Sequence, residues 1–302
     1  MTNIATFILP LLPILARAAA GQANVEGPPT IIRLDVNLVV INVTVSDADG
    51  TSVSGLKKQA FRLFVDDAPR PISLFRGEDT PVTAGIVVDN SASMAPKRSE
   101  VIAAALAFAR SSNPQDQMFV IHFSDHARLG LPPARPFTDN IVDLEKALST
   151  FAPAGTTALY DAVGLALSHL GRATLERKIL ILITDGGDNS SRAHLSDISH
   201  WAQKSGVVFY CIGLFDDSDD NRNPRILSEF AELTGGKAFF PSSVEDTTRR
   251  CIEIAHEIRS QYTIGFPGAE DGKFHRIKVT AEDPRYGTLG VRTRPGYFAA
   301  KP

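Results

Sequence analysis

The sequence contains only two cysteines and one tryptophan in 302 residues, and it has no stretch rich in lysine and arginine. Two cysteines cannot form the disulfide framework of a small secreted domain. Cys211 and Cys251 lie in apolar patterns that predict small buried residues, and a bridge between them stays open at this point. A net charge of −3 without a basic run argues against nucleic acid as a partner, because phosphate binding needs a concentrated basic face.

Long apolar segments are missing after residue 20, so no part of the mature chain is expected to span a membrane. The chain starts with a short apolar run, Ile4 to Ala16, followed by small residues up to Gly21. This pattern predicts a signal peptide over residues 1–23, although no basic residue precedes the run. A buried N-terminal segment and an anchor stay open as alternatives. We expect an exported protein that is periplasmic, displayed on the cell surface or secreted.

Short apolar strands alternate with helical patterns between residues 80 and 260. Strands are predicted at 84–89, 118–123, 178–184, 207–214 and 237–240, with an edge strand at 128–131. Helices are predicted at 99–110, 139–151, 157–170, 195–205, 224–234 and 244–260. Strands that are apolar on both faces belong in a sheet covered by helices. The order predicts an α/β fold with a doubly wound, mostly parallel sheet flanked by helices.

Both flanks of this region show apolar alternation, which is typical of strands with one buried face. The segments concerned are 31–45, 61–65, 274–281 and 291–298. Neither flank has enough strands to bury a sheet alone. We predict that the flanks pair into one small β-rich domain, with the α/β domain inserted between them. The predicted organisation is a signal peptide or N-terminal apolar segment (1–23), a β-rich flank (24–79), the α/β domain (80–260) and a second β-rich flank (261–302).

Oxygen-bearing side chains stand where two of the apolar strands end. Asp89, Ser91 and Ser93 follow the first strand in Asp-Asn-Ser-Ala-Ser, and Asp185 ends a later strand. Thr157 lies in the loop before a helix, in Thr-Ala-Leu-Tyr-Asp. If the two strands are neighbours, their carboxylates converge and repel by about 4 kcal/mol at a protein surface. Neither motif contains a lysine or arginine, whereas Mg²⁺ accepts this all-oxygen set, and Mn²⁺ or Ca²⁺ could replace it.

Together these segments resemble the metal-ion-dependent adhesion site of von Willebrand factor type A domains, over roughly residues 81–260. The resemblance selects Thr157 rather than Thr156 as the third ligand group, because Thr157 begins the family's Thr-Ala-Leu-Tyr-Asp run. It also implies a Rossmann-like fold and a metal with one coordination position open for a carboxylate of a partner protein. Segments in both flanks resemble those around A domains in exported bacterial proteins. We therefore expect an adhesion or assembly protein that depends on a divalent cation.

A metal-dependent hydrolase that uses the same ion is the alternative. Its nearest candidates for a general base are His122, Asp125 and His194. The pattern around His122 is that of a packed strand residue, and the other two lie in predicted surface loops. No zinc-protease, nucleophile-elbow or phosphate-loop motif occurs in the sequence. The expectation is a binding module without enzymatic activity.

Overall fold

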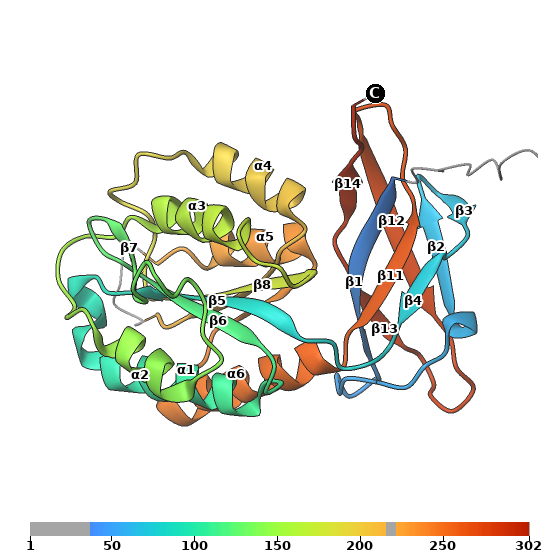
Figure 1. The fold of residues 1–302 in the computed structure, drawn as a ribbon. Helices are drawn as coiled ribbons and strands as arrows, with labels where there is room; N and C mark the ends of the chain where they lie inside the picture. The colour runs from blue at the N-terminus through green and yellow to red at the C-terminus, as the bar shows by residue number, and fades with distance from the viewer. Residues whose placement is uncertain (1–36, 216–221, 302) are drawn as a thin grey trace, which may run out of the picture. The chain divides into compact units, whose positions relative to one another are not determined.

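The computed structural model describes residues 37–215 and 222–301. The predicted signal peptide (1–23) and the start of the first flank (24–36) lie outside these residues. Within the described part, a six-stranded sheet with helices on both faces is accompanied by two four-stranded antiparallel sheets (Figure 1). No helix of the described part is long and apolar enough to cross a membrane.

The central sheet has the strand order β10-β9-β8-β5-β6-β7. Five strands are parallel and β7 is antiparallel to β6. The strands are β5 (Val82–Asp89), β6 (Gln117–Phe123), β7 (Ala127–Leu129), β8 (Arg177–Thr184), β9 (Val208–Gly213) and β10 (Lys237–Phe239). All eight residues of β5 are buried, as expected for the middle strand of a covered sheet. The predicted doubly wound α/β arrangement is confirmed.

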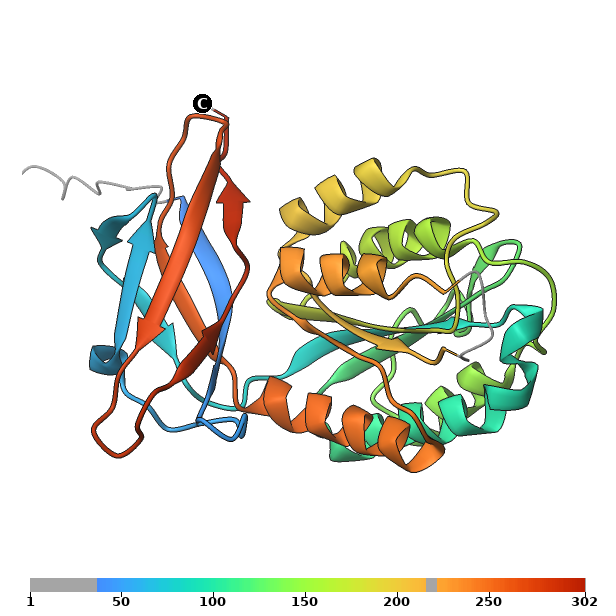
Figure 2. The same ribbon diagram turned by 180° about the vertical axis from the view of Figure 1, so that it is seen from behind.

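Helices cover the two faces of this sheet in two groups of three (Figures 1 and 2). One face carries α1 (Arg98–Ser111), α2 (Ile141–Ser149) and α6 (Val244–Arg259). The other carries α3 (Leu159–Leu170), α4 (Leu195–Ser205) and α5 (Pro224–Thr234). The side chains of Asn140, Asn223 and Ser243 accept hydrogen bonds from the first turns of α2, α5 and α6. Such caps satisfy amides that have no partner within the helix and so fix where each helix begins.

The flanks form two antiparallel sheets with the orders β13-β1-β11-β4 and β14-β12-β2-β3. Their strands are β1 (Leu38–Ser46), β2 (Phe61–Val65), β3 (Ala68–Arg70), β4 (Leu74–Arg76), β11 (Tyr262–Pro267), β12 (Phe274–Ala281), β13 (Gly290–Arg292) and β14 (Gly296–Phe298). A short 3₁₀ turn, η1 (Lys58–Ala60), precedes β2. Each sheet contains strands from both ends of the chain, and the sheets share one hydrophobic core. The flanks therefore build a single β-sandwich, as the predicted fold class requires.

The sequence patterns were wrong about the strands of the sandwich in two ways. The predicted strand 291–298 is split into β13 and β14, which belong to different sheets. The break falls at Thr293 to Pro295, where proline has no amide hydrogen to continue a ladder. The strands β3, β4 and β11 were not predicted. All three residues of β3 are exposed, so that strand has no apolar alternation to detect.

The two cysteines are free and buried, so no disulfide joins them. Cys211 lies in β9 and Cys251 in α6. Burial raises the pKa of both thiols. They act as small apolar core residues, and a thiolate at either position is strongly disfavoured.

Candidate metal centre

Hydrogen bonds join four of the five predicted ligands into one cluster. The Ser91 amide donates to Asp89 Oδ1 at 2.8 Å, and the hydroxyl oxygens of Ser91 and Ser93 are 3.1 Å apart. The Ser93 hydroxyl donates to Asp185 Oδ1 at 3.1 Å. Asp89 and Asp185 are each only 1% exposed. The structure thus brings two buried carboxylates and two serine hydroxyls from distant parts of the chain together.

The parallel pairing of β5 with β8 explains why the carboxylates meet. Val88 lies opposite Ile183 in the register, so Asp89 and Asp185 follow at the same edge of the sheet. The 3₁₀ turn η2 (Ala92–Lys97) begins directly after Ser91, whose backbone is extended with φ −61° and ψ 163°. This turn folds Ser93 back over the strand end. The ligand set therefore lies outside the carboxyl ends of parallel strands, where doubly wound folds bind ligands.

Thr157 is held at the same edge through main-chain contacts. Its amide donates to Asn189 Oδ1 at 2.8 Å, and its carbonyl oxygen accepts from the Asn189 amide at 3.0 Å. The loop before it is tied to the β5 end, because the Ala154 amide donates to the Asn90 carbonyl at 2.8 Å. Among the described residues, no hydrogen bond joins the Thr157 hydroxyl to the four clustered side chains. Thr157 is therefore brought to this edge of the sheet but is not part of the hydrogen-bonded cluster.

Asp89 carries an unfavourable buried charge at neutral pH. Burial raises the pKa of Asp89 to about 6, although hydrogen bonds from the Thr184 hydroxyl and the Ser91 amide lower it. The negative charge of Asp185 adds a smaller upward contribution to that pKa. A raised pKa of this kind means that the surroundings contain too little positive charge for the ionised form.

The donor chemistry of the cluster fits a hard divalent cation. Asp89, Ser91, Ser93, Asp185 and, at the same edge, Thr157 offer only oxygen atoms, which Mg²⁺ and Ca²⁺ prefer over nitrogen or sulfur. Within the described residues, no group of three or more histidine, cysteine, aspartate or glutamate side chains is arranged to hold a metal. The serine hydroxyls are therefore the side-chain oxygens that join the two carboxylates in the cluster, and water can fill further positions on an ion.

Two contacts of the cluster were not anticipated from sequence. The Thr184 hydroxyl donates to Asp89 Oδ2 at 2.5 Å, and the Lys97 ammonium lies 3.4 Å from Asp185 Oδ2. The two motifs contain no lysine or arginine, yet the structure places the ammonium of Lys97 beside Asp185. Lys97 lies just beyond the Asp-x-Ser-x-Ser motif, and only the turn η2 returns it to the site. The position of Thr184 at the end of an apolar strand was the one available signal, because its hydroxyl can donate to a carboxylate.

Two of the residues considered for a hydrolase, His122 and Asp125, line a hollow that also includes Asn90 of the first ligand motif, but other groups engage both. His122 is 2% exposed, its Nε2 lies 2.7 Å from the Ala147 carbonyl oxygen, and burial lowers its pKa. Asp125 is engaged by the hydroxyl and amide of Thr156, which lower its pKa. His194 is exposed and directly precedes α4. His122 is thus a packed core residue, as its sequence pattern predicts.

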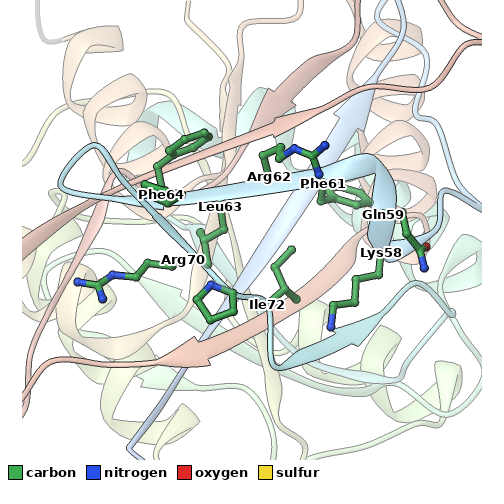
Figure 3. Close-up of a pocket in the computed structure, with 10 residues that line it drawn as sticks. Lys58, Gln59, Phe61, Arg62, Leu63, Phe64, Arg70 and Ile72 are labelled. Atoms are coloured by element: carbon green, nitrogen blue, oxygen red, sulfur yellow. The ribbon is translucent and has the colours of Figure 1, made fainter.

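Two hollows in the surface differ in their relation to the cluster. One, of about 240 Å³, lies beside it and is lined by Asn90, Asp125, His126, Arg128 and Phe151 among others. Another, of about 370 Å³, lies in the sandwich (Figure 3). Its lining residues all come from 58–72 and include no carboxylate, so it offers no ligand set for a hard cation.

Comparison with protein families matches residues 85–187 to the model of the von Willebrand factor type A domain. The matched range contains all five candidate ligands, from Asp89 to Asp185. No curated protein matches the sequence.

Similar solved structures include a von Willebrand factor type A protein from Catenulispora acidiphila, at 14% identity and a TM-score of 0.52. That comparison covers 87% of this chain and 74% of the other. Proximal thread matrix protein 1 from the mussel byssus is 17% identical with a TM-score of 0.51, over 69% of this chain and 51% of that one. The vWF domain of the type V pili tip protein Mfa5 from Porphyromonas gingivalis is 13% identical with a TM-score of 0.48. That comparison covers 60% of this chain and 95% of the other. At such identities the likeness concerns the fold alone.

Proposed function

Since this chain contains a von Willebrand factor type A domain, we propose that it is a binding protein controlled by a divalent cation. The ion, Mg²⁺ in the first instance and Mn²⁺ or Ca²⁺ as substitutes, is held by Asp89, Ser91, Ser93, Thr157 and Asp185. A carboxylate of a partner protein completes its coordination. The proposed role is adhesion or assembly outside the cytoplasm, in the periplasm, on the cell surface or after secretion.

The observation that carries this proposal is the pair of buried carboxylates at the ends of β5 and β8. Their hydroxyl neighbours supply further oxygen ligands but no positive charge. A divalent cation would offset the charge repulsion and favour the ionised form of Asp89, whose pKa is raised to about 6 without it. Protein ligands on one side of an ion leave its outer side for water or for an acidic side chain.

The partner surface includes more than the ion. The hollow of about 240 Å³ beside the cluster gives a place for residues next to the partner's carboxylate. Its rim carries Arg128, whose guanidinium carbon lies 5.8 Å from the centre of the Phe151 ring. A partner segment with an acidic residue flanked by further polar or aromatic side chains suits this combination of ion, guanidinium and ring.

A binding module is favoured over a metal-dependent hydrolase because two candidate bases among the described residues, His122 and Asp125, are engaged by other groups. Hydrolysis at a metal requires a water held by the ion and, in most cases, a general base within hydrogen-bond reach of it. His122 is hydrogen-bonded to the Ala147 carbonyl oxygen, and Asp125 to Thr156.

The test of the proposed function is isothermal titration with Mg²⁺, followed by a screen of ester and phosphoester substrates. Binding without metal-dependent turnover agrees with the proposal, whereas no binding of Mg²⁺, Mn²⁺ or Ca²⁺ refutes it.

The affinity for Mg²⁺ is expected to fall at acidic pH. The ion binds the ionised form of Asp89, so a proton competes with it below the pKa of about 6. The affinity should be nearly constant above pH 7 and should fall about tenfold per pH unit well below the pKa. Titrations at pH 5.0, 6.0 and 7.5 measure this dependence. An affinity that is unchanged between pH 7.5 and pH 5.0 contradicts direct coordination by Asp89.

A further inference from the structure

Lys97 places a positive charge inside the proposed metal centre. Its ammonium nitrogen lies 3.4 Å from Asp185 Oδ2 and donates a hydrogen bond to the Leu214 carbonyl oxygen at 2.6 Å. The Lys97 side chain is 16% exposed and that of Asp185 is 2% exposed. An ammonium group this close to a carboxylate in a largely dry site interacts strongly with it, because solvent screens the pair only weakly.

The two oxygens of the Asp185 carboxylate have different partners. Asp185 Oδ1 accepts a hydrogen bond from the Ser93 hydroxyl, while Oδ2 faces the Lys97 ammonium. A divalent ion that binds Asp185 comes close to the ammonium, and two cations at such a distance repel each other. Lys97 also cannot serve as a ligand, because a protonated amine has no lone pair to donate. Ion binding and the present position of Lys97 therefore oppose each other.

The local fold places Lys97 at the junction of η2 and α1. It is the last residue of η2, the turn that also carries Ser93, and α1 begins at the next residue, Arg98. Its hydrogen bond to Leu214 connects this turn to the chain after β9. The turn that presents the hydroxyl ligands thus also carries Lys97, and the contacts with Asp185 and Leu214 hold its ammonium beside the carboxylates.

We propose that Lys97 is an internal competitor of the divalent ion. In the metal-free protein it supplies the positive charge that Asp185 requires, and it lowers the affinity of the site for the ion. This inference rests on the proposed metal site. Lys97 is a positioning residue that acts on the ion through Asp185, and it sets the ion concentration at which the site fills.

The test compares Mg²⁺ titrations of the wild type with those of Lys97→Gln and Lys97→Arg at pH 7.5. Glutamine removes the charge and keeps an N–H donor for the Leu214 carbonyl, and arginine keeps the charge. We expect Lys97→Gln to bind Mg²⁺ about tenfold more tightly than the wild type and Lys97→Arg to bind within a factor of about two. Thermal unfolding of the metal-free proteins should show lower stability for Lys97→Gln, because Asp185 loses its counter-charge.

The possible outcomes separate this inference from the proposed function. Tighter binding by Lys97→Gln, but not by Lys97→Arg, supports both the metal site and the competitor role of Lys97. This includes the case in which the wild type binds Mg²⁺ too weakly to measure. Equal binding by the wild type and Lys97→Gln keeps the metal site and overturns the competitor role. Weaker binding by Lys97→Gln also overturns it, because Lys97 then only supports the structure. A complete lack of binding in all three proteins overturns the metal site and the inference together.

Discussion

Replacing Asp89 by asparagine is expected to weaken Mg²⁺ binding at least about 100-fold, because even partners outside the ligand shell cost up to that factor. The same variant should be more stable than the wild type when both are metal-free at pH 7. The pKa of Asp89 is raised from 3.8 to about 6 in the folded protein, so its ionised form costs about 3 kcal/mol at neutral pH. Asparagine removes that charge with little change in shape.

The hydrogen bonds around the substituted side chain can be kept. The Thr184 hydroxyl, which donates to Asp89 Oδ2, also lies 3.3 Å from the Gly186 carbonyl oxygen. In Asp89→Asn it can donate to Gly186 and accept from the new amide, while the amide oxygen keeps the bond from Ser91. After allowance of about 1 kcal/mol for imperfect geometry, a net gain of about 2 kcal/mol remains. The unfolding temperature should rise by about 4–8 °C in the metal-free state.

The pH dependence of stability separately checks whether Asp89→Asn stabilises the metal-free protein. Because the folded pKa of Asp89 is raised, its contribution to stability is complete below about pH 3.8 and is lost as the pH rises through about 6. The advantage of Asp89→Asn should therefore vanish at pH 4. Asp125→Asn is the matched control: Asp125 is exposed, and Thr156 lowers its pKa, so its substitution should leave Mg²⁺ binding unchanged and bring no gain at pH 7. Wild-type Mg²⁺ affinity in Asp89→Asn would refute the assigned ligand.

The α/β part of the fold and the two carboxylates could be predicted because local patterns encode them. An apolar strand segment that ends on an aspartate, as residues 84–89 of β5 do at Asp89, marks both the sheet and the edge where ligands bind. The helices were predicted to within two residues at each end, since their apolar periodicity is a local signal. The cap of α2 was placed one or two residues early, because Thr138 and Asp139 are also good cap residues, whereas the structure uses Asn140.

What could not be predicted depends on contacts between distant segments. Lys97 reaches Asp185 only because η2 turns back over the strand end, and no spacing rule in the sequence announces that contact. The division of 291–298 into strands of two sheets likewise depends on partners far away in the chain, β1 for one and β12 for the other. Such pairings follow from three-dimensional packing rather than from periodicity.

Replacing Glu257 by glutamine is expected to destabilise the protein by about 3 kcal/mol, the lower end of the cost of breaking a buried ion pair. Glu257 lies in α6, is 6% exposed, and forms an ion pair with Arg292 of β13. Its Oε1 also accepts hydrogen bonds from the Tyr210 hydroxyl at 2.5 Å and from Thr44 at 3.4 Å. Burial and then the charge of Glu257 raise the pKa of Tyr210, so the phenol stays a donor.

The variant leaves Arg292 without its counter-charge and gives the Tyr210 hydroxyl a weaker, neutral acceptor. Loss of about 3 kcal/mol should lower the unfolding temperature by about 6–12 °C in a domain of this size.

Glu253→Gln is the matched control, because Glu253 lies one turn earlier in α6 and pairs with Lys237 and Arg250 at the surface. Exposed pairs are worth about 0–1 kcal/mol, so that control should shift the unfolding temperature by no more than a few degrees. Equal shifts in the two variants would mean that the network joining α6 and β9 to β1 and β13 adds nothing beyond a surface pair. Neither substitution touches the metal ligands, so Mg²⁺ affinity should stay at the wild-type value in both, which separates loss of stability from loss of the site.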